Sequence, residues 1–311
     1  MRYVDNTMLR TLARCETAAA LRHVLGYVGK GDESGPAAQA GIAMHEALAA
    51  YFRTGLVADA VAALEPYRTY SDAHGLGDPG SRFARLSYEN VLRVLTAWIE
   101  DHPREQLPFT VEAVEVGFSV PLTDTVAFTG RIDAIVRSRH NGELYVVDHK
   151  TTARLTPDWV AQWKRDVQMS GYVWAVQCTL GQPVVGVYIN AIELQRLPTS
   201  GRPCATHGVP YAECGSLHSQ SQFILVSRSP MQLAEWRAEA IALAQQYEAL
   251  AARVTSVADA TQTRVQGLFT GGCTYCTFRD FCLAGRPPAY ASTMLRHDPW
   301  MPHALAVEKE Q

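Results

Sequence analysis

The sequence of 311 residues lacks several features that define common classes of protein. It contains no apolar run of about 18 residues, so no membrane-spanning helix is expected. Its first residues have no apolar segment like that of a secretory signal peptide, which predicts a cytoplasmic protein. The phosphate-binding pattern GxxxxGK[ST] is absent, so the chain carries no P-loop motor. The nucleophile pattern GxSxG is absent as well.

Excess charge is also lacking, since the net charge is only -3. This excludes a protein that coats nucleic acid through overall basicity. Any binding of nucleic acid must use a local basic groove, or metal ions that offset an acidic site. The sequence contains seven cysteines, an odd number, which fits a framework of disulfides poorly. Disulfides are also rare in the cytoplasm, the expected location.

The pattern of apolar residues predicts an α+β fold, with a mixed central sheet flanked by helices. Helices are expected over residues 7–25, 39–53, 57–67, 81–101, 156–180 and 229–254. Strands rich in β-branched residues are expected over residues 111–120, 126–137, 143–148, 184–194 and 222–227. Asn141 and Gly142 supply a turn signal for a hairpin between the second and third of these strands.

Three charged residues fall on that predicted hairpin. Asp133 lies inside one strand, and Asp148 and Lys150 end the next. Alternate residues of a strand share a face, so Asp148 and Lys150 point the same way and His149 points away. A surface Asp and Lys would be the simpler interpretation, but the preceding run Leu-Tyr-Val-Val indicates a buried strand. Carboxylates hold Mg²⁺ or Mn²⁺, which activates water for phosphodiester hydrolysis, and a lysine can orient that water or stabilise the developing charge.

The segments Gly130–Asp133 and Asp148–Lys150 resemble the GxxD and (D/E)xK motifs of the PD-(D/E)XK nuclease superfamily. Residues 41–45 resemble the G-x-x-x-H motif of its RecB-like branch, and residues 168–172 resemble the Q-x-x-x-Y motif. The resemblance implies a restriction-endonuclease-like core and a nuclease activity. Many relatives have Glu at the position of Asp148.

The resemblance also implies roles for individual residues. His45, Asp133 and Asp148 would be metal ligands, and Lys150 would be catalytic. Gln168 and Tyr172 share a helix face and would support the site or the DNA backbone. Glu115 matches an acidic position of some relatives more weakly.

Four cysteines form a second constellation. Cys273, Cys276 and Cys282 have the spacing C-x2-C-x5-C, and Cys15 supplies a distant fourth thiol. This split pattern resembles that of RecB-like nucleases with a [4Fe–4S] cluster, including AddB-type and CRISPR-associated exonuclease relatives. Such a cluster would tie the N-terminal helix to the C-terminal segment. Zinc is the alternative metal, although zinc ribbons usually contain two C-x-x-C pairs.

The remaining cysteines have weaker patterns. Cys204, His207, Cys214 and His218 form C-x2-H-x6-C-x3-H in a loop-like stretch, which is either a zinc site or an ordinary insertion. Cys178 lies in an apolar predicted helix, where core packing is expected.

These patterns predict three regions: a helical region with Cys15 and His45 (residues 1–108), a nuclease core (109–255), and an iron–sulfur segment with a tail (256–311). The expected function is a Mg²⁺- or Mn²⁺-dependent DNA nuclease, with exonuclease activity inferred from family analogy. Its substrate would be DNA that is single-stranded or has free ends. Recombination, repair and phage or CRISPR DNA processing are all consistent settings, with a helicase or recombination protein as partner. A non-catalytic DNA-binding or scaffold subunit and a structure-specific endonuclease are the alternatives.

Overall fold

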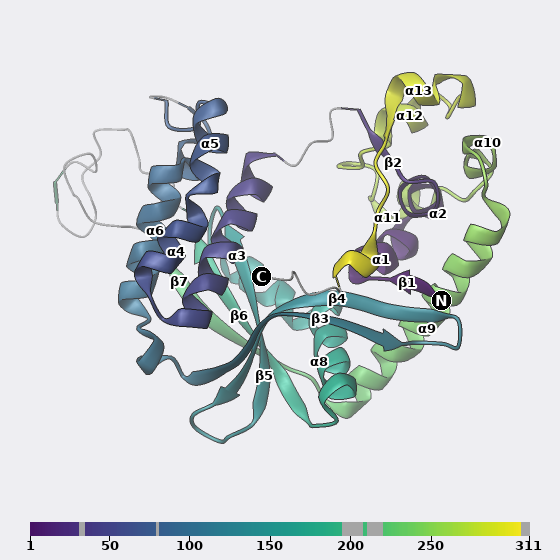
Figure 1. The fold of residues 1–311 in the computed structure, drawn as a ribbon. Helices are drawn as coiled ribbons and strands as arrows, with labels where there is room; N and C mark the ends of the chain where they lie inside the picture. Colours follow the sequence, from purple (N-terminus) through teal and green to yellow (C-terminus); the bar gives the residue numbers. More distant parts are fainter. Residues whose placement is uncertain (31–34, 79–80, 195–207, 210–219, 306–311) are drawn as a thin grey trace.

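The computed structural model describes residues 1–30, 35–78, 81–194, 208–209 and 220–305. A six-stranded mixed sheet forms its centre (Figure 1). The strand order is β1 (Arg2–Val4), β4 (Val126–Ser138), β5 (Leu144–Thr152), β6 (Val184–Glu193) and β7 (Ser221–Ser227), and β3 (Phe109–Pro121) also pairs with β4. The pairs β1–β4 and β5–β6 are parallel, and the other pairs are antiparallel.

Strand β4 is shared between two partners along one edge. Its first residues, Val126–Phe128, pair with β1, and residues 134–137 pair with β5, while β3 pairs along the opposite edge. Strand β5 therefore separates from β4 near the middle of β4. This fork leaves Asp133 at the point where the two strands diverge.

Helices cover both faces of the sheet. One face packs against α3 (Pro36–Thr54), α4 (Val57–Leu64), α5 (Pro66–Ala73) and α6 (Tyr88–Asp101), with the 3-10 helix η2 (Ala84–Leu86) before α6. The other face packs against α1 (Asn6–Arg14), α8 (Val167–Leu180) and α9 (Pro230–Arg253). The burial of apolar side chains against the sheet on both faces is the main stabilising contribution to this arrangement.

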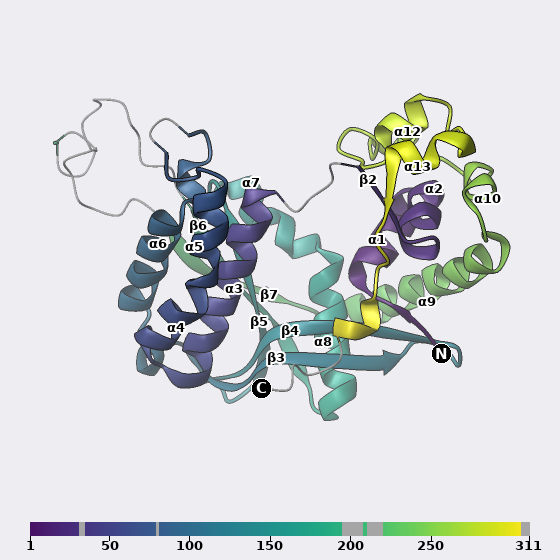
Figure 2. The ribbon, with the colours of Figure 1, turned by 45° about the horizontal axis from the view of Figure 1, so that its top comes forward.

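The two ends of the chain share a third core, visible as the purple and yellow-green segments of Figure 2. Helix α2 (Glu16–Ala19) and the π-helix η1 (Ala20–Val24) pack among α10 (Val257–Thr261), α12 (Arg279–Leu283) and α13 (Ala291–Met294). Helix α11 (Gly267–Thr270) contacts the end of α1, where the Thr270 hydroxyl donates to the carbonyl of Arg14. Strand β2 (Tyr27–Gly29) pairs with β8 (Leu295–His297). No helix in the described part of the chain is long and apolar enough to cross a membrane.

The predicted α+β fold with a mixed sheet is confirmed, but some predicted helices were wrong in detail. The single helix expected over residues 7–25 is interrupted at Cys15, whose backbone is extended (φ -163°). The helix expected over residues 156–180 is broken into α7 (Pro157–Gln162), η4 (Trp163–Arg165) and α8, because Asp166 caps α8. The segment 57–67 divides between α4 and α5, where Pro66 starts the second helix.

Cys178 is exposed, because it lies in the last turn of α8, so its predicted core packing was wrong. Cys204, His207, Cys214 and His218 lie outside the described residues. The division of the chain at residues 108 and 255 stays a prediction, although β1 adds a strand from the first region to the central sheet.

Candidate active site

The fork between β4 and β5 brings the two predicted aspartates together. The ladder ends at the pair Ala134–Val147, so Asp133 and Asp148 are the next residues across from each other. Beyond the ladder, the backbone N–H of His149 donates to Oδ2 of Asp133 at 2.6 Å. The side chain of Asp133 thus takes the place of a backbone acceptor and is held at the fork.

Helix α3 delivers His45 to the same point. His45 Nδ1 lies 3.3 Å from Oδ2 of Asp133. One helical turn earlier, a Cβ atom added to Gly41 would lie 3.2 Å from Oγ1 of Thr151, at the end of β5. Glycine at this position lets α3 approach the strand closely, which explains physically why a glycine precedes this histidine by four residues.

Lys150 lies over the buried carboxylate of Asp148. Its Nζ is 2.9 Å from Oδ1 and 2.7 Å from Oδ2 of Asp148. The side chain of Asp148 is 2% exposed, whereas that of Lys150 is 22% exposed. The lysine ammonium is therefore the part of this pair that meets the solvent, as the alternation along β5 predicts.

Helix α8 contributes Gln168 and Tyr172 on the side of Asp148. The side-chain amide of Gln168 donates to the Tyr172 hydroxyl at 2.7 Å. Burial raises the pKa of Tyr172 well above its ordinary value, and the carboxylates of Asp148 and Asp133 raise it further. The phenol therefore stays neutral beside the two aspartates.

His149 points away from the aspartates, as predicted, into the core under α3 and α6. The indole N–H of Trp98 donates to Oδ1 of Asn190, and the amide group of Asn190 donates to Nδ1 of His149 at 2.9 Å. Burial lowers the pKa of His149 to about 3, so the imidazole is neutral. Because Nδ1 accepts a hydrogen bond, the proton lies on Nε2. Sequence reasoning missed this network, which fixes the segment that carries Asp148 and Lys150.

A cavity of about 390 Å³ opens at the fork. Asp133, His45, Lys150 and Glu115 line it, together with Arg131 and the first turns of α3. Glu115 lies on β3 opposite Asp133, with the backbone in the left-handed region (φ 56°), and its carboxylate is 3.7 Å from the Arg131 guanidinium. Burial raises the pKa of Glu115, and the charge of Asp133 raises it further. Gln168 and Tyr172 do not line this cavity.

The two aspartates have opposite electrostatic environments. Burial alone would raise the pKa of Asp133, but His45, His149 and Lys150 hold it well below its usual range. Burial raises the pKa of Asp148 to about 6, although Lys150 opposes this effect. For His45, burial lowers the pKa, but the charge and hydrogen bond of Asp133 outweigh it, so the pKa lies above its ordinary value.

The donor set at the fork is chemically suited to a hard divalent cation. Asp133, Asp148 and Glu115 supply carboxylate oxygens, which Mg²⁺ and Mn²⁺ prefer, and His45 supplies a nitrogen. Within the described ranges, no three His, Cys, Asp or Glu side chains are arranged closely enough to hold a metal ion. Lys150 contacts both carboxylate oxygens of Asp148. A metal ion can therefore be bound by both aspartates only if Lys150 moves away from one of these oxygens.

The four predicted cluster cysteines line a second cavity, of about 430 Å³. Cys15 enters it from between α1 and α2, and Cys273, Cys276 and Cys282 enter from the C-terminal segment. Within the described residues, no three of these cysteines lie closely enough together to hold a metal ion, but all four line the same cavity. Burial raises the pKa of Cys282 to about 11, and neighbouring cysteines add to this effect.

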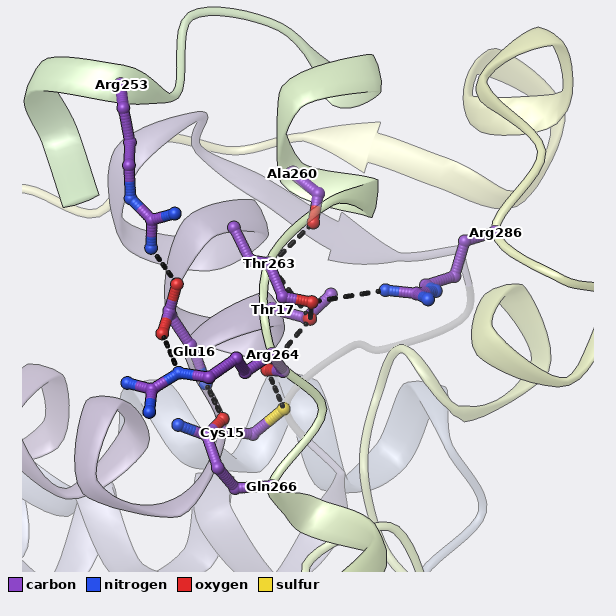
Figure 3. A network of polar contacts seen from close by, with 9 residues as sticks. All are labelled: Cys15, Glu16, Thr17, Arg253, Ala260, Thr263, Arg264, Gln266 and Arg286. Carbon is purple, nitrogen blue, oxygen red and sulfur yellow. Dashed lines mark hydrogen bonds and ion pairs between the residues drawn. The ribbon is translucent and has the colours of Figure 1, made fainter.

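Polar contacts beside Cys15 tie the two ends of the chain together (Figure 3). Glu16, whose side chain is 2% exposed, forms ion pairs with Arg253 and, at 2.8 Å, with Arg264. The backbone N–H of Glu16 donates to the side chain of Gln266 at 2.8 Å. These contacts give the backbone at Cys15 a fixed position relative to the C-terminal segment.

The family described as the PD-(D/E)XK nuclease superfamily matches residues 6–283. Among solved structures, a "putative exonuclease" from Eubacterium rectale aligns over 86% of this chain and 85% of its own, with a TM-score of 0.51 and 13% identity, a likeness that concerns the fold. The structure of SSO0001 aligns over 70% of this chain and 81% of its own, with 18% identity, but its TM-score of 0.32 is too low to inform the fold. No curated protein matches the sequence.

Proposed function

The chain belongs to the PD-(D/E)XK nuclease superfamily, and from that premise we propose that it is a metal-dependent deoxyribonuclease acting from free DNA ends. The observation that carries the proposal is the fork itself. Two aspartates from adjacent strands and a lysine meet there beside a solvent-accessible cavity. The exonuclease assignment is supported by the likeness in fold to the Eubacterium rectale structure, which is named as an exonuclease.

In this proposal, Asp133, Asp148 and His45 hold Mg²⁺ or Mn²⁺, the ions that members of the superfamily typically use. The ion, when bound, supplies activation of water and polarisation of the phosphodiester. Lys150, released from Asp148, orients the attacking water or donates to the phosphate oxygen on which charge develops.

The remaining residues position this machinery. The backbone N–H of His149 holds the carboxylate of Asp133, and Tyr172, oriented by Gln168, lies beside Asp148 as a neutral hydroxyl donor. Glu115 adds a further carboxylate opposite Asp133.

Cleavage of end-labelled linear DNA and of covalently closed circular DNA tests the proposal. With Mg²⁺ or Mn²⁺ we expect the linear substrate to be degraded, the circle to be spared, and EDTA to stop the reaction. Asp148→Ala should lose cleavage, whereas the exposed Asp124→Ala should behave as wild type. Cutting of the circle would favour a structure-specific endonuclease. Absence of cleavage with retained DNA binding would favour a scaffold subunit.

The proposal includes a [4Fe–4S] cluster held by Cys15, Cys273, Cys276 and Cys282. Four thiols that enter one cavity from distant parts of the chain support it, because thiolates are the usual ligands of iron–sulfur clusters. The cluster would close the third core by joining the N-terminal segment to the C-terminal segment.

Metal analysis of protein purified without air tests this part of the proposal. About four irons per chain are expected, the number that a cubane requires. Cys15→Ala should lose iron, and Cys178→Ala, which removes an exposed thiol elsewhere, should retain it. Zinc in place of iron would overturn the cluster.

A further inference from the structure

A groove separate from the acidic cavity lies between α1, the η4–α8 junction and α9. Its volume is about 1080 Å³, larger than that of either cavity described above. Arg10 and Arg14 line it from α1, and Lys164 and Arg165 line it from η4. It is a basic feature on a chain whose net charge is -3.

Two of the positive charges in this groove, those of Lys164 and Arg165, are available to a ligand. Within the described residues, Lys164 and Arg165 form no ion pair, and both side chains are exposed. Arg228 also lines the groove, and its guanidinium donates to Ser170 and to backbone carbonyls of η4 and Asp166, which are neutral acceptors.

Negative charge is confined to parts of the wall. Asp166 lies 3.5 Å from the Arg10 guanidinium, which offsets it, and Glu235 and Glu239 lie on the α9 side. The basic lining residues therefore come from α1, from η4 and from Arg228 just before α9, and the acidic residues without an ion pair in the described part of the chain come from α9 itself.

The groove begins next to the candidate active site. Lys150 Nζ lies 5.6 Å from the centre of the Trp163 ring. Trp163 is the first residue of η4, and the next two residues are Lys164 and Arg165. The same short helix thus contacts the catalytic lysine and carries two cations into the groove.

The wall also has apolar parts. Leu9, Trp236 and Leu243 line the groove, but Leu9 and Trp236 are buried and offer little apolar surface. Phe269, 94% exposed, precedes Thr270, which lines the groove at its α11 end. A single strand presents both phosphates and bases, so it can use basic and apolar surface together, whereas a duplex presents mainly phosphates.

We propose that this groove binds single-stranded DNA and guides it to or from the fork, with phosphates on the η4 and α1 side. This inference rests on the proposed nuclease function, because it assigns the path of that enzyme's substrate. Lys164 and Arg165 are the residues on which the path most depends.

Equilibrium binding of a fluorescent single-stranded oligonucleotide tests the proposal. The measurement uses the Asp148→Ala variant with EDTA, so that the DNA is bound without being cleaved. Lys164→Ala with Arg165→Ala should weaken binding about tenfold. It should also reduce the slope of log K against log salt by about 1.4, since each phosphate contact on a single strand contributes about 0.7. The matched control pair, Arg53→Ala with Arg82→Ala, removes two exposed charges from the helical face and should change neither quantity.

Two results would overturn the groove assignment. One is unchanged affinity and salt slope in the Lys164 and Arg165 double variant. The other is an equal loss of affinity for a blunt duplex of the same length, which would contradict the single-strand path. Either result would leave the nuclease proposal intact, because cleavage by protein with native Asp148 is measured separately.

Discussion

Replacing Glu16 with glutamine should lower the free energy of unfolding by about 2 kcal/mol. The carboxylate is 2% exposed and forms charge-assisted contacts with Arg253 and Arg264. Each such contact contributes about 1.5–3 kcal/mol in mutational series. The arginine side chains are 54% and 70% exposed and regain water when released, so only part of that contribution is lost. Glutamine keeps the shape but turns one acceptor into a donor that faces a guanidinium.

Urea denaturation of protein purified with its native metal content measures this effect. The midpoint should fall with an unchanged m-value, which shows that stability has changed and compactness has not. Glu112→Gln is the matched control, because it removes the partner of Arg137 in an exposed ion pair and should cost less than about 0.5 kcal/mol. Equal effects of the two substitutions would refute the reasoning that burial makes the Glu16 contacts important.

Three further predictions concern the fork. Lys150→Ala should reduce cleavage by about 10²–10³-fold, as for the loss of other groups that stabilise developing charge. Calorimetry should find Mn²⁺ affinity retained in this variant, because an Asp148 oxygen is released, and a loss of Mn²⁺ binding would contradict this. Wild-type Mn²⁺ affinity should fall by at least about fourfold between pH 7.5 and 5.5, because ligands bind metal when deprotonated, burial raises the pKa of Asp148 to about 6, and the pKa of His45 lies above its ordinary value; a flat profile would count against both residues as ligands. Gly41→Ala should lower cleavage severalfold by pushing α3 from Thr151, and adding Thr151→Ala should restore it; no rescue would place the effect elsewhere.

The parts of the fold that could be predicted depend on local patterns. The β-branched runs that form β3, β4 and β5 carry their own signal, because side-chain alternation is a property of a single strand. Strand β1 carries no such signal: Arg2–Val4 is too short and becomes a strand through its pairing with Val126–Phe128. The extended backbone at Cys15 is equally hidden, because the contacts that hold it come from Gln266 and Arg264.

The candidate site shows the same division. The alternation of Asp148 and Lys150 predicts that they share a side, and the hairpin predicts that Asp133 lies beside them; the structure brings these three residues together. The hydrogen bonds that link Trp98, Asn190 and His149 could not be predicted, because each of the three residues comes from a different element. Their contact exists only after α6, β6 and β5 have packed.

Anomalous diffraction from a crystal soaked in Mn²⁺ tests the central claim most directly. The account predicts a manganese peak at the fork, bounded by the carboxylates of Asp133 and Asp148 and by His45, with Lys150 moved away from Asp148. The peak should be absent from Asp148→Ala crystals soaked in the same way. A manganese peak elsewhere, or an empty fork in wild-type crystals at saturating Mn²⁺, would contradict the assignment of this site as the metal centre of a nuclease.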